Sequence, residues 1–321
     1  MRAAANTGNP ACDDLVLERV ITIQTADTSS SAHRPPSTTD AAIRCFAIRA
    51  TTAENIGALA AECLRLEVNT HPKPGLVSHI DAGAHRDMDA QLLYHSADTL
   101  APFFAELATA GTVGAGLDRL REIGIAAERA MLAATGGVNT HRGAIFGLGL
   151  MAAAAGFRDS NGICGPLGRI VATLWGRSIA SMPAVPESHG AGAARRYGAG
   201  GARKEAALGF PSVYGVAIPA LTVGRRLTGG DAEAARVQAC LALIAAVGDT
   251  NLLHRGGLDG LAFAQRVAGA FLAAGGVGQP RWRRKALRIH EMFVARNLSP
   301  GGCADLLAMA LFAHTLGGPV G

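Results

Sequence analysis

Polar and charged residues gather in five short segments where longer apolar stretches are interrupted. In the first, EVNTHPKPGLVS (67–78), Lys73 lies between Pro72 and Pro74, whose rings hold the backbone extended. An ammonium group fixed in this way suits a phosphate ligand. An exposed lysine on a rigid turn fits the same pattern, so both interpretations stay open from this segment alone.

The second segment, GAHRDMD (83–89), places His85, Arg86, Asp87 and Asp89 within about one helical turn. Asp87 or Asp89 offers the hard oxygen ligands that a divalent cation prefers. An acidic pair before an apolar stretch is also typical of a helix start, where carboxylates interact with the free N–H groups. The capping interpretation is the more common of the two.

The third segment, ATGGVNTHRG (134–143), directly precedes the apolar stretch AIFGLGLMAAAAG. Its two adjacent glycines allow close approach of the backbone, and Asn139 or Thr140 is placed to cap the following helix. Free N–H groups at a helix start favour a phosphate, and His141 and Arg142 add positive charge there. The pattern is neither a Walker A motif nor GxGxxG.

The fourth segment, GDTNLLHRGG (248–257), follows a strongly apolar predicted helix and carries Asp249, Asn251, His254 and Arg255. The negative end of a helix dipole disfavours a bare carboxylate. We therefore interpret Asp249, placed at this predicted helix C-terminus, as a residue that has a metal ion or a cationic partner.

The fifth segment, NLSPGGCADLLAM (297–309), predicts a helix that begins at Ser299 or Gly302. Asp305 then falls in its first turn, where the helix dipole accounts for an acid. The five segments jointly predict a polar pocket where helix ends meet, with carboxylates for Mg²⁺ and basic side chains for phosphates. Such a pocket suits a nucleoside triphosphate without a P-loop.

Helices must position these segments. Apolar residues recur at helical spacing in TAENIGALAAECLRLEVNT (52–70), with Thr52 as its N-cap, and no segment shows a run of period-2 alternation. We predict an all-α fold, a single helical domain with Gly-rich interhelical loops around a central polar pocket. The other predicted helices are 89–111, 116–135, 143–156, 211–227, 231–249, 260–276, 280–297 and 304–316.

The composition agrees with packed helices. Of the 321 residues, 49% are hydrophobic but only 5% are aromatic, which favours alanine-rich helices over a β-sandwich. The net charge of +5 fits a protein that handles phosphorylated metabolites about as well as a weak nucleic-acid binder, and neither follows from charge alone. An ordinary basic surface is the simpler explanation, and we expect no nucleic-acid partner. A Ser-, Thr- and Pro-rich leader at 1–39 is predicted to be flexible, with the ordered domain at 40–321.

The six cysteines form no CxxC pair and lie mostly in apolar helical contexts, as expected for free thiols in a reducing compartment. Residues 1–31 lack the continuous apolar region of a signal peptide. No apolar stretch reaches the roughly 18 residues that a membrane span requires. The sequence therefore predicts a soluble cytoplasmic protein with no membrane partner, and it leaves the oligomeric state open.

Five motifs, in this order, resemble the triphosphoribosyl-dephospho-coenzyme A synthase family over about residues 53–318: HPKPGLVSHIDAGAHRDM, TGGVNTHRGAIF, RRYGAGGARKEAALGFP, GDTNLLHRGG and NLSPGGCADLLA. The resemblance implies an all-helical, Mg²⁺-dependent transferase that joins ATP to 3′-dephospho-coenzyme A and releases adenine. The product is the prosthetic-group precursor of the malonate decarboxylase and citrate lyase carrier proteins, passed on to a carrier-protein prosthetic-group transferase. The first motif looks more like the malonate decarboxylase branch.

The resemblance also suggests roles for single residues. Asp87 and Asp249 are expected to hold Mg²⁺, with Glu67 or Asp305 as a third acid. The general base is a carboxylate, with Asp249 or Glu67 the first choices. The residues expected to contact the two substrates, with the phosphates assigned to the first four, are Lys73, His141, Arg142, Arg255, His85, Asn139, Thr140, Arg203, Asn251 and His254.

Two basic stretches allow further interpretations, and the first of them contains Arg203. The Gly-rich stretch 195–211, with Arg195, Arg196, Arg203 and Lys204, looks like a mobile cover over the coenzyme phosphates, although a solvated linker fits its composition too. The later run RWRRKALRIH is interpreted as a solvated helix face.

Two other functions compete with the transferase. A metal-dependent hydrolase of N-glycosidic or ADP-ribosyl bonds would use a similar helical pocket and consume a nucleotide with water alone. A non-catalytic nucleotide- or coenzyme-sensing protein would bind and release nothing. Adenine release with and without dephospho-coenzyme A separates the three.

Overall fold

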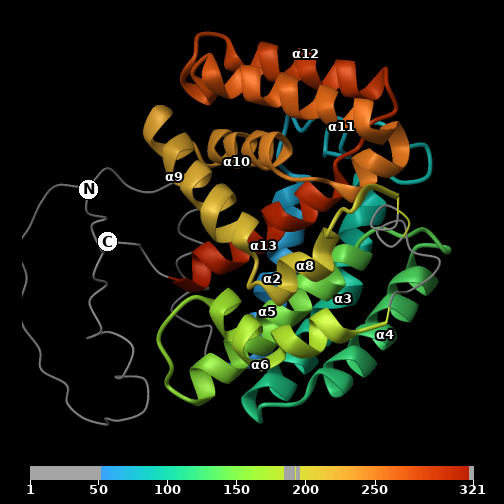
Figure 1. Cartoon of the computed structure of the whole chain (residues 1–321), viewed down its shortest axis with the longest axis vertical. Helices are drawn as coiled ribbons and strands as arrows, with labels where there is room; N and C mark the ends of the chain where they lie inside the picture. The colour runs from blue at the N-terminus through green and yellow to red at the C-terminus, as the bar shows by residue number, and fades with distance from the viewer. Residues whose placement is uncertain (1–51, 184–191, 193–195, 318–321) are drawn as a thin grey trace, which may run out of the picture. The chain divides into compact units, whose positions relative to one another are not determined.

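The computed structural model describes residues 52–183, 192 and 196–317, which form helices and no strand and belong to one compact unit (Figure 1). The predicted all-α class is confirmed; the predicted leader lies outside the described residues. The α-helices are α2 (Ala53–Val68), α3 (Ala90–Thr112), α4 (Leu117–Ala134), α5 (Arg142–Ser160), α6 (Leu167–Ser181), α8 (Gly201–Ala207), α9 (Ile218–Leu227), α10 (Ala232–Ala246), α11 (Thr250–Ala273), α12 (Trp282–Val294) and α13 (Gly301–Gly317). A π-helix η2 (Val213–Ala217) and a 3₁₀-helix η3 (Gly276–Gly278) complete them.

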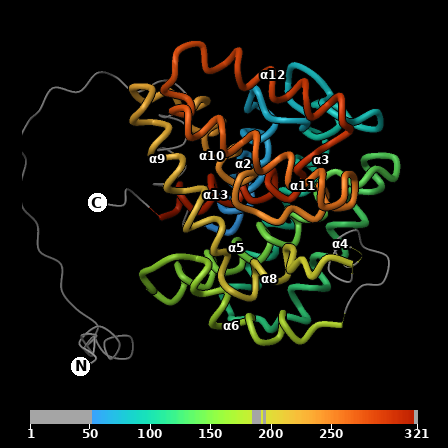
Figure 2. The backbone as a smooth tube through the Cα atoms, turned by 45° about the horizontal axis from the view of Figure 1, so that its top comes forward, coloured from blue at the N-terminus to red at the C-terminus, as the bar shows by residue number. Residues whose placement is uncertain are grey.

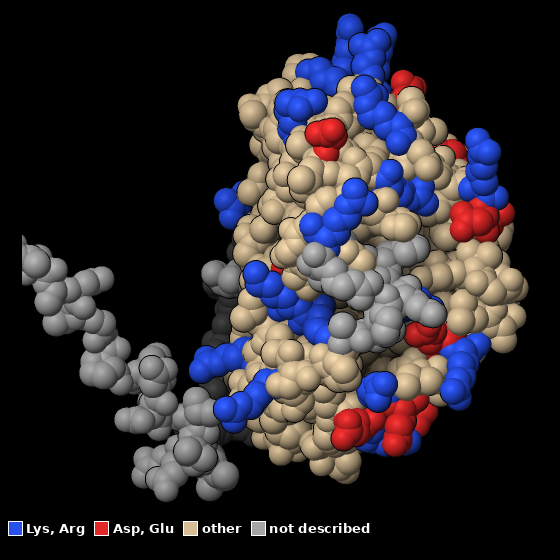
Figure 3. Space-filling model, turned by 45° about the vertical axis from the view of Figure 1, so that its right-hand side comes forward, with Lys and Arg blue, Asp and Glu red and all other residues tan. Residues whose placement is uncertain are grey.

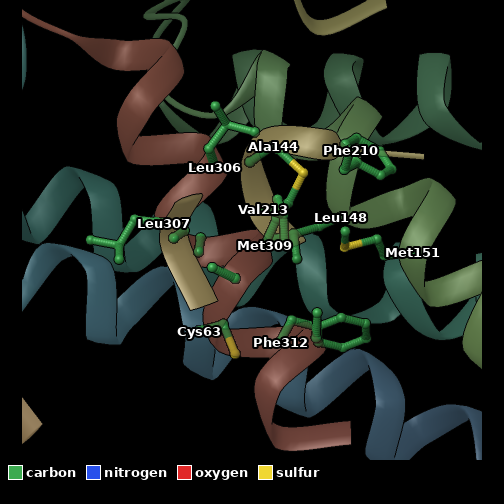
Figure 4. Close-up of a cluster of buried hydrophobic side chains, with 14 of the residues drawn as sticks. Cys63, Ala144, Leu148, Met151, Phe210, Val213, Leu306, Leu307, Met309 and Phe312 are labelled. Atoms are coloured by element: carbon green, nitrogen blue, oxygen red, sulfur yellow. The ribbon is translucent and has the colours of Figure 1, made fainter. Parts of the chain in front are cut away.

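Helices α5 and α13 form the centre of the core. Both are apolar around most of their circumference, and a helix of this kind is stable only when other helices cover it. In both backbone views α13 runs through the middle, with α12 at the top and α6 at the bottom (Figures 1 and 2). Met309 and Phe312 of α13 lie among Leu148 and Met151 of α5 (Figure 4).

Glycine allows the central helices to come unusually close. A Cβ atom placed on Gly156 of α5 would lie 2.0 Å from the carbonyl oxygen of Ala108 in α3, and one on Gly111 would lie 1.9 Å from that of Ala153. On another side of α5, a Cβ on Gly147 would meet the sulfur of Met309 at 2.4 Å. Several of the many glycines therefore serve close helix packing rather than chain flexibility.

Several helices begin at a side chain that caps them. The predicted N-cap Thr52 accepts a hydrogen bond from Asn55 N at 3.3 Å, and Asp89 accepts from Leu92 N at 2.9 Å. Asp89 is thus a cap of α3, the commoner of its two interpretations. The predicted helix 231–249 is too long at its end, because α10 ends at Ala246 and Asp249 is the N-cap of α11.

Helix α11 replaces a predicted polar break. The segment 248–257 was expected between helices, yet Thr250 onward is helical up to a backbone break at Gly257, where φ is 61°. That positive φ suits glycine, which lacks the Cβ that disfavours the left-handed region. The chain resumes as helix immediately after Gly257, so α11 consists of two helical parts joined at a kink.

Among the described residues, no single helix is long and apolar enough to cross a membrane. Helices α10 and α11 meet the length and composition limits only as a pair, with a 59° bend between them. Cys63, Cys240 and Cys303 are buried free thiols and Cys164 is an exposed one, as the cysteine pattern predicts. The other two cysteines lie outside the described residues.

The close approach of α3 and α5 gives a stability prediction. Replacing Gly156→Ala should lower the free energy of unfolding by about 1–3 kcal/mol, because the new methyl group overlaps the Ala108 carbonyl. Gly124→Ala in α4, where a Cβ meets nothing within 4 Å, should raise it by about 0.5–1 kcal/mol. Urea denaturation measures both; equal effects of the two changes would contradict the close packing.

Candidate active site

The N-termini of three helices, α5, α11 and α13, are joined by two aspartates. Asp249 caps α11 and also accepts a hydrogen bond from Cys303 N in the first turn of α13. Asp305 projects from α13 to the start of α5, where Ala144 N donates to it and a Cβ on Gly143 would lie 2.0 Å from its Oδ2. The positive ends of three helix dipoles therefore face two carboxyl groups, of which Asp249 is buried and Asp305 half-buried.

Asp249 is buried and fully hydrogen-bonded. Its Oδ1 accepts from Asn251 N at 2.7 Å and Leu252 N at 3.1 Å, and its Oδ2 accepts from Cys303 N at 2.8 Å. Burial raises the pKa of this carboxyl, while the bonds from Cys303, Leu252 and Asn251 act to lower it. The expectation of a bare carboxylate at a helix C-terminus is wrong, and the expected role of Asp249 as a metal ligand stays a prediction.

Asp305 has a different environment. It is the fifth residue of α13 rather than part of its first turn, so the dipole of its own helix does not account for it. Desolvation, and then the negative charges of Glu67 and Asp249, raise its pKa well above the usual range, with only the Ala144 N–H acting to lower it. The protonated form of Asp305 is therefore favoured, as a proton donor requires.

Glu67 and Lys73 form a buried ion pair beside these aspartates. Lys73 has no exposed surface, and its ammonium group contacts Glu67 Oε1. Thr70, between them in sequence, is fully buried and accepts from Arg236 Nε at 2.8 Å. The interpretation of Lys73 as an exposed lysine is thus excluded. Its expected phosphate contact stays a prediction, since the pair would have to open toward substrate.

His141 is buried at the start of α5. Burial, followed by the nearby Lys73 charge, lowers its pKa to about 4, so the ring is neutral at neutral pH. The expectation that it adds positive charge is wrong. Its Nδ1 lies 2.8 Å from Ser96 Oγ, which also contacts Thr140 Oγ1 at 2.7 Å. A neutral imidazole held in this way exchanges hydrogen bonds with a ligand rather than charge.

The other residues of this segment are partly as predicted. The N-cap position of α5 is His141 rather than Asn139 or Thr140, but Asn139 Oδ1 accepts from Arg142 N at 3.2 Å and so satisfies one N–H group at the helix start. Thr140 does not cap, because its hydroxyl is bonded to Ser96. The Arg142 guanidinium pairs with Glu128 of α4 and stays nearly half exposed, so a substrate phosphate would compete with that partner.

A second cluster joins the segment 79–89 to residues 297–299. His85 Nε2 lies 2.8 Å from Ser299 Oγ, and Arg255 donates to Asn297 Oδ1 at 2.9 Å and to the carbonyl oxygen of Ala84 at 3.1 Å. Burial and the Arg255 charge lower the pKa of His85, which Asp87 acts to raise. Beside this cluster is an open pocket of about 600 Å³. Its lining residues are Ala82, His85, Arg86, Asp87, Met88, Asp89, Gln91, Leu92 and His95.

The two expected metal ligands lie in different clusters. Asp87 is 61% exposed and contacts His85 Nδ1 at 3.4 Å, whereas Asp249 is buried against Cys303. Across the described part of the chain, no group of three or more His, Cys, Asp or Glu side chains is arranged to hold a metal ion. Mg²⁺, which keeps several waters and shares substrate phosphates, needs only one or two carboxylates, and the exposed Asp87 fits that requirement.

The remaining predicted residues lie around these clusters. Asn251 packs against the start of α13, where a Cβ on Gly301 would lie 2.6 Å from its Nδ2, and His254 is exposed on α11. Arg203 of α8 donates to the carbonyl oxygens of Met182 at 2.6 Å and Pro183 at 2.7 Å. It therefore fastens α8 to the end of α6, while the proposed cover function of this stretch stays a prediction.

Two further basic features complete the comparison with the sequence. Arg196 stacks on Tyr197, with 5.2 Å from the guanidinium carbon to the ring centre, and Arg195 lies outside the described residues. On the face drawn in Figure 3, the Lys and Arg side chains are scattered among uncharged ones. That distribution agrees with the interpretation of an ordinary basic surface.

The sequence interpretation missed His290. The run RWRRKALRIH was assigned to a solvated helix face, yet Ala286, His290 and Phe293 are the buried face of α12. His290 Nδ1 lies 2.7 Å from the carbonyl oxygen of Lys73. The i, i+4, i+7 spacing of these three residues was the available signal, masked by the five basic side chains around it.

Glu67 and Lys73, buried just at and after the end of α2, and Asp249, buried at the start of α11, give this all-α fold the character of an enzyme, because such burial costs stability that a purely structural core avoids. The chain belongs to the CitG family, ATP:dephospho-CoA triphosphoribosyl transferase, whose model matches residues 53–321. It is therefore a transferase, and the resemblance stated from the five motifs is confirmed at the level of the family.

The chain matches its curated relatives over most of their length. A probable 2-(5′′-triphosphoribosyl)-3′-dephosphocoenzyme-A synthase of Azotobacter vinelandii is 43% identical over 85% of this chain and 96% of its own. The protein of the same name from Stutzerimonas stutzeri is 40% identical over 83% of this chain and 93% of its own length. The 2-(5′′-triphosphoribosyl)-3′-dephosphocoenzyme-A synthase of Pectobacterium atrosepticum is 40% identical over 78% of this chain and 85% of its own length. No solved structure matches the chain.

The environment of Asp305 predicts a pH-dependent stability. Its pKa is raised in the folded protein above about 3.9 in the unfolded chain, so the folded state keeps a proton that the unfolded state releases. This contribution is complete below about pH 4 and is lost as pH rises toward the folded pKa. Asp305→Asn cannot titrate, so its unfolding free energy relative to the parent should increase from pH 4 to pH 7.

Denaturant unfolding at several pH values measures this difference. Asp118→Asn, on the exposed first turn of α4, is the control for removing one carboxyl group. A difference between Asp305→Asn and the parent that stays constant with pH would mean that Asp305 is ionised in the folded protein.

Proposed function

We propose that the chain transfers the triphosphoribosyl group of ATP to the 2′-hydroxyl of 3′-dephospho-coenzyme A and releases adenine. The observation that carries this proposal is the cluster in which the buried Glu67–Lys73 pair, at the end of α2, lies beside Asp249 and the half-buried Asp305 at three helix starts, in a chain of this family. The bond from the ribose anomeric carbon to adenine breaks, and a bond from that carbon to the 2′-oxygen forms. The hydroxyl gives its proton to a base, and adenine takes up a proton from a donor as it leaves.

This chemistry asks for two acid–base groups with different protonation. The transition state resembles an oxocarbenium ion, so a base is needed at the hydroxyl and a proton donor at adenine. Asp305 is the proposed donor, because its surroundings favour the protonated form. Of the two candidate bases we choose Glu67, since Asp249 already accepts three backbone N–H bonds.

Several groups are suited to the triphosphate. Arg255 and Arg142 are the proposed cations, the first beside the open pocket and the second at the start of α5. His141 would donate a hydrogen bond as a neutral ring, and the N–H groups at the start of α5 favour an anion. Lys73 would compensate negative charge from within the cluster, without leaving Glu67.

Magnesium is part of the proposal. Asp87 would hold the ion together with triphosphate oxygens at the edge of the pocket. When bound, Mg²⁺ neutralises phosphate charge and fixes the triphosphate. The expected second ligand, Asp249, is the weaker candidate, because its oxygens are engaged with backbone N–H groups.

The product suggests a place in the cell. We propose that it supplies the prosthetic group of the malonate decarboxylase carrier protein, with the citrate lyase carrier as the alternative. A carrier-protein prosthetic-group transferase in the cytoplasm would consume it. The neighbouring genes distinguish the two destinations.

The activity is tested by incubating the protein with ATP, Mg²⁺ and 3′-dephospho-coenzyme A. We expect adenine and a product whose mass equals dephospho-coenzyme A plus ATP minus adenine, with release depending on both substrates. Chromatography with mass detection follows both. Adenine release without dephospho-coenzyme A would favour the N-glycosidic hydrolase, and binding without any release would favour the nucleotide sensor.

The magnesium assignment has its own test. Asp87→Asn should raise the Mg²⁺ concentration needed for half-maximal rate by about tenfold, since one anionic ligand is lost. The melting temperature should stay unchanged because Asp87 is largely exposed. Asp118→Asn, another exposed aspartate, is the matched control. An unchanged Mg²⁺ requirement for Asp87→Asn would remove this residue from the metal site.

A further inference from the structure

His290 connects the surface helix α12 to the segment that carries Lys73. Its Nδ1 lies 2.7 Å from the Lys73 carbonyl oxygen, which can only accept, so Nδ1 must carry a proton. Its Nε2 lies 3.2 Å from Asp81 Oδ1. The ring is 5% exposed and lies 217 residues from Lys73 in sequence.

A second proton must lie between His290 and Asp81, because two lone pairs would otherwise face each other. Asp81 is 37% exposed, and its Oδ1 also accepts from Gly83 N at 2.8 Å, which fixes the position of this oxygen. The contact with Asp81 therefore orients the ring so that Nδ1 faces the Lys73 carbonyl oxygen. The other ionisable groups around it are His71, with its ring centre 6.1 Å away, and then His79 and Glu233 near His71.

The Lys73 segment has few other anchors of this kind. Pro72 and Pro74 supply no N–H group, and within the segment the Lys73 carbonyl accepts only a long bond of 3.3 Å, from Leu76 N. The side chain of Lys73 is wholly buried and points into the carboxylate cluster. A shift of its backbone would therefore move the ammonium group relative to Glu67.

The close contact of Gly75 keeps the segment against α12. A Cβ on Gly75 would lie 2.0 Å from the carbonyl oxygen of Leu298 and 3.0 Å from Cβ of Phe293, the residue one turn after His290. The φ of Gly75 is +68°, which glycine adopts readily. Helix α12 and the residues after it thus fix both the position and the orientation of this segment.

We propose that His290, oriented by Asp81, is a positioning residue for the catalytic cluster: through the Lys73 carbonyl it holds the Lys73 ammonium against Glu67. This role rests on the proposed part of Lys73 and Glu67 in the transfer. His290 contacts no substrate in this proposal, so its loss should slow the chemical step more than it weakens substrate binding.

Two substitutions separate the two ring nitrogens. His290→Asn places an amide N–H near the position of Nδ1 and keeps the donor to Lys73. His290→Gln reaches the position of Nε2 and loses that donor. We expect kcat to fall at least about tenfold in H290Q with KM values within about twofold, and H290N to stay within about threefold of the parent. Melting temperatures of the two variants should be similar, because each keeps one of the two hydrogen bonds.

Control variants show whether His290 positions Lys73 or only stabilises the folded protein. Arg284→Gln, on the exposed face of α12, should leave kcat unchanged. Asp81→Asn keeps the ring and its Nδ1 donor, so, like H290N, it should stay within about threefold of the parent kcat with KM unchanged. If H290Q does not fold, the ¹⁵N-histidine signals described below test the orientation. Equal losses of kcat in H290Q and H290N that follow their melting temperatures would overturn the proposal, and so would full activity in H290Q.

A spectroscopic readout makes the test independent of turnover. In the full-length protein labelled with ¹⁵N-histidine, the ring signals missing from H290N identify His290. Its Nδ1 should appear protonated, and the ring signals should shift in the Asp81→Asn protein. An unprotonated Nδ1 in the parent would overturn the proposed orientation, whereas a parent that releases no adenine would overturn the proposed function instead.

Discussion

The structure depends on holding three carboxyl groups close to one another, Glu67 and Asp249 buried and Asp305 half-buried, without leaving their charges uncompensated. Each is stabilised by a different means. Glu67 has the Lys73 ammonium, Asp249 has three N–H groups from two helix starts, and Asp305 is surrounded so that its protonated form is favoured. Removing the compensation from a buried charge costs several kcal/mol, so the elements that supply these groups cannot move apart.

This constraint explains why the helices meet where they do. Asp249 binds the first turns of both α11 and α13, and Asp305 reaches the start of α5, so the aspartates set the relative positions of three helix ends. The helices must then lie close together, and Gly143 and Gly147 make room on α5 for Asp305 and Met309. Gly143 is in this respect required by the polar centre, and Gly147 by the apolar packing beside it.

The sequence predicted the parts that local patterns determine. The all-α class, the cap at Thr52 and the order of the polar segments follow from periodicity and from neighbouring residues. It did not predict the neutral His141, the N-cap at Asp249 or the buried His290. Those depend on partners far away in the chain, such as the 217 residues between His290 and Lys73, and no local pattern reports such distances.

The three means of compensation also keep the three carboxyl groups chemically distinct. Had each been neutralised by an adjacent lysine, all would be equivalent anions and none could give up a proton. Asp305 instead has one N–H donor and two carboxyl neighbours, an asymmetry that favours its acid form beside Glu67, whose charge Lys73 offsets. A pair of titratable groups whose surroundings separate them in this way is what acid–base chemistry at one pH requires. The packing that orders the helix starts and the chemistry proposed for the site are therefore two results of the same arrangement.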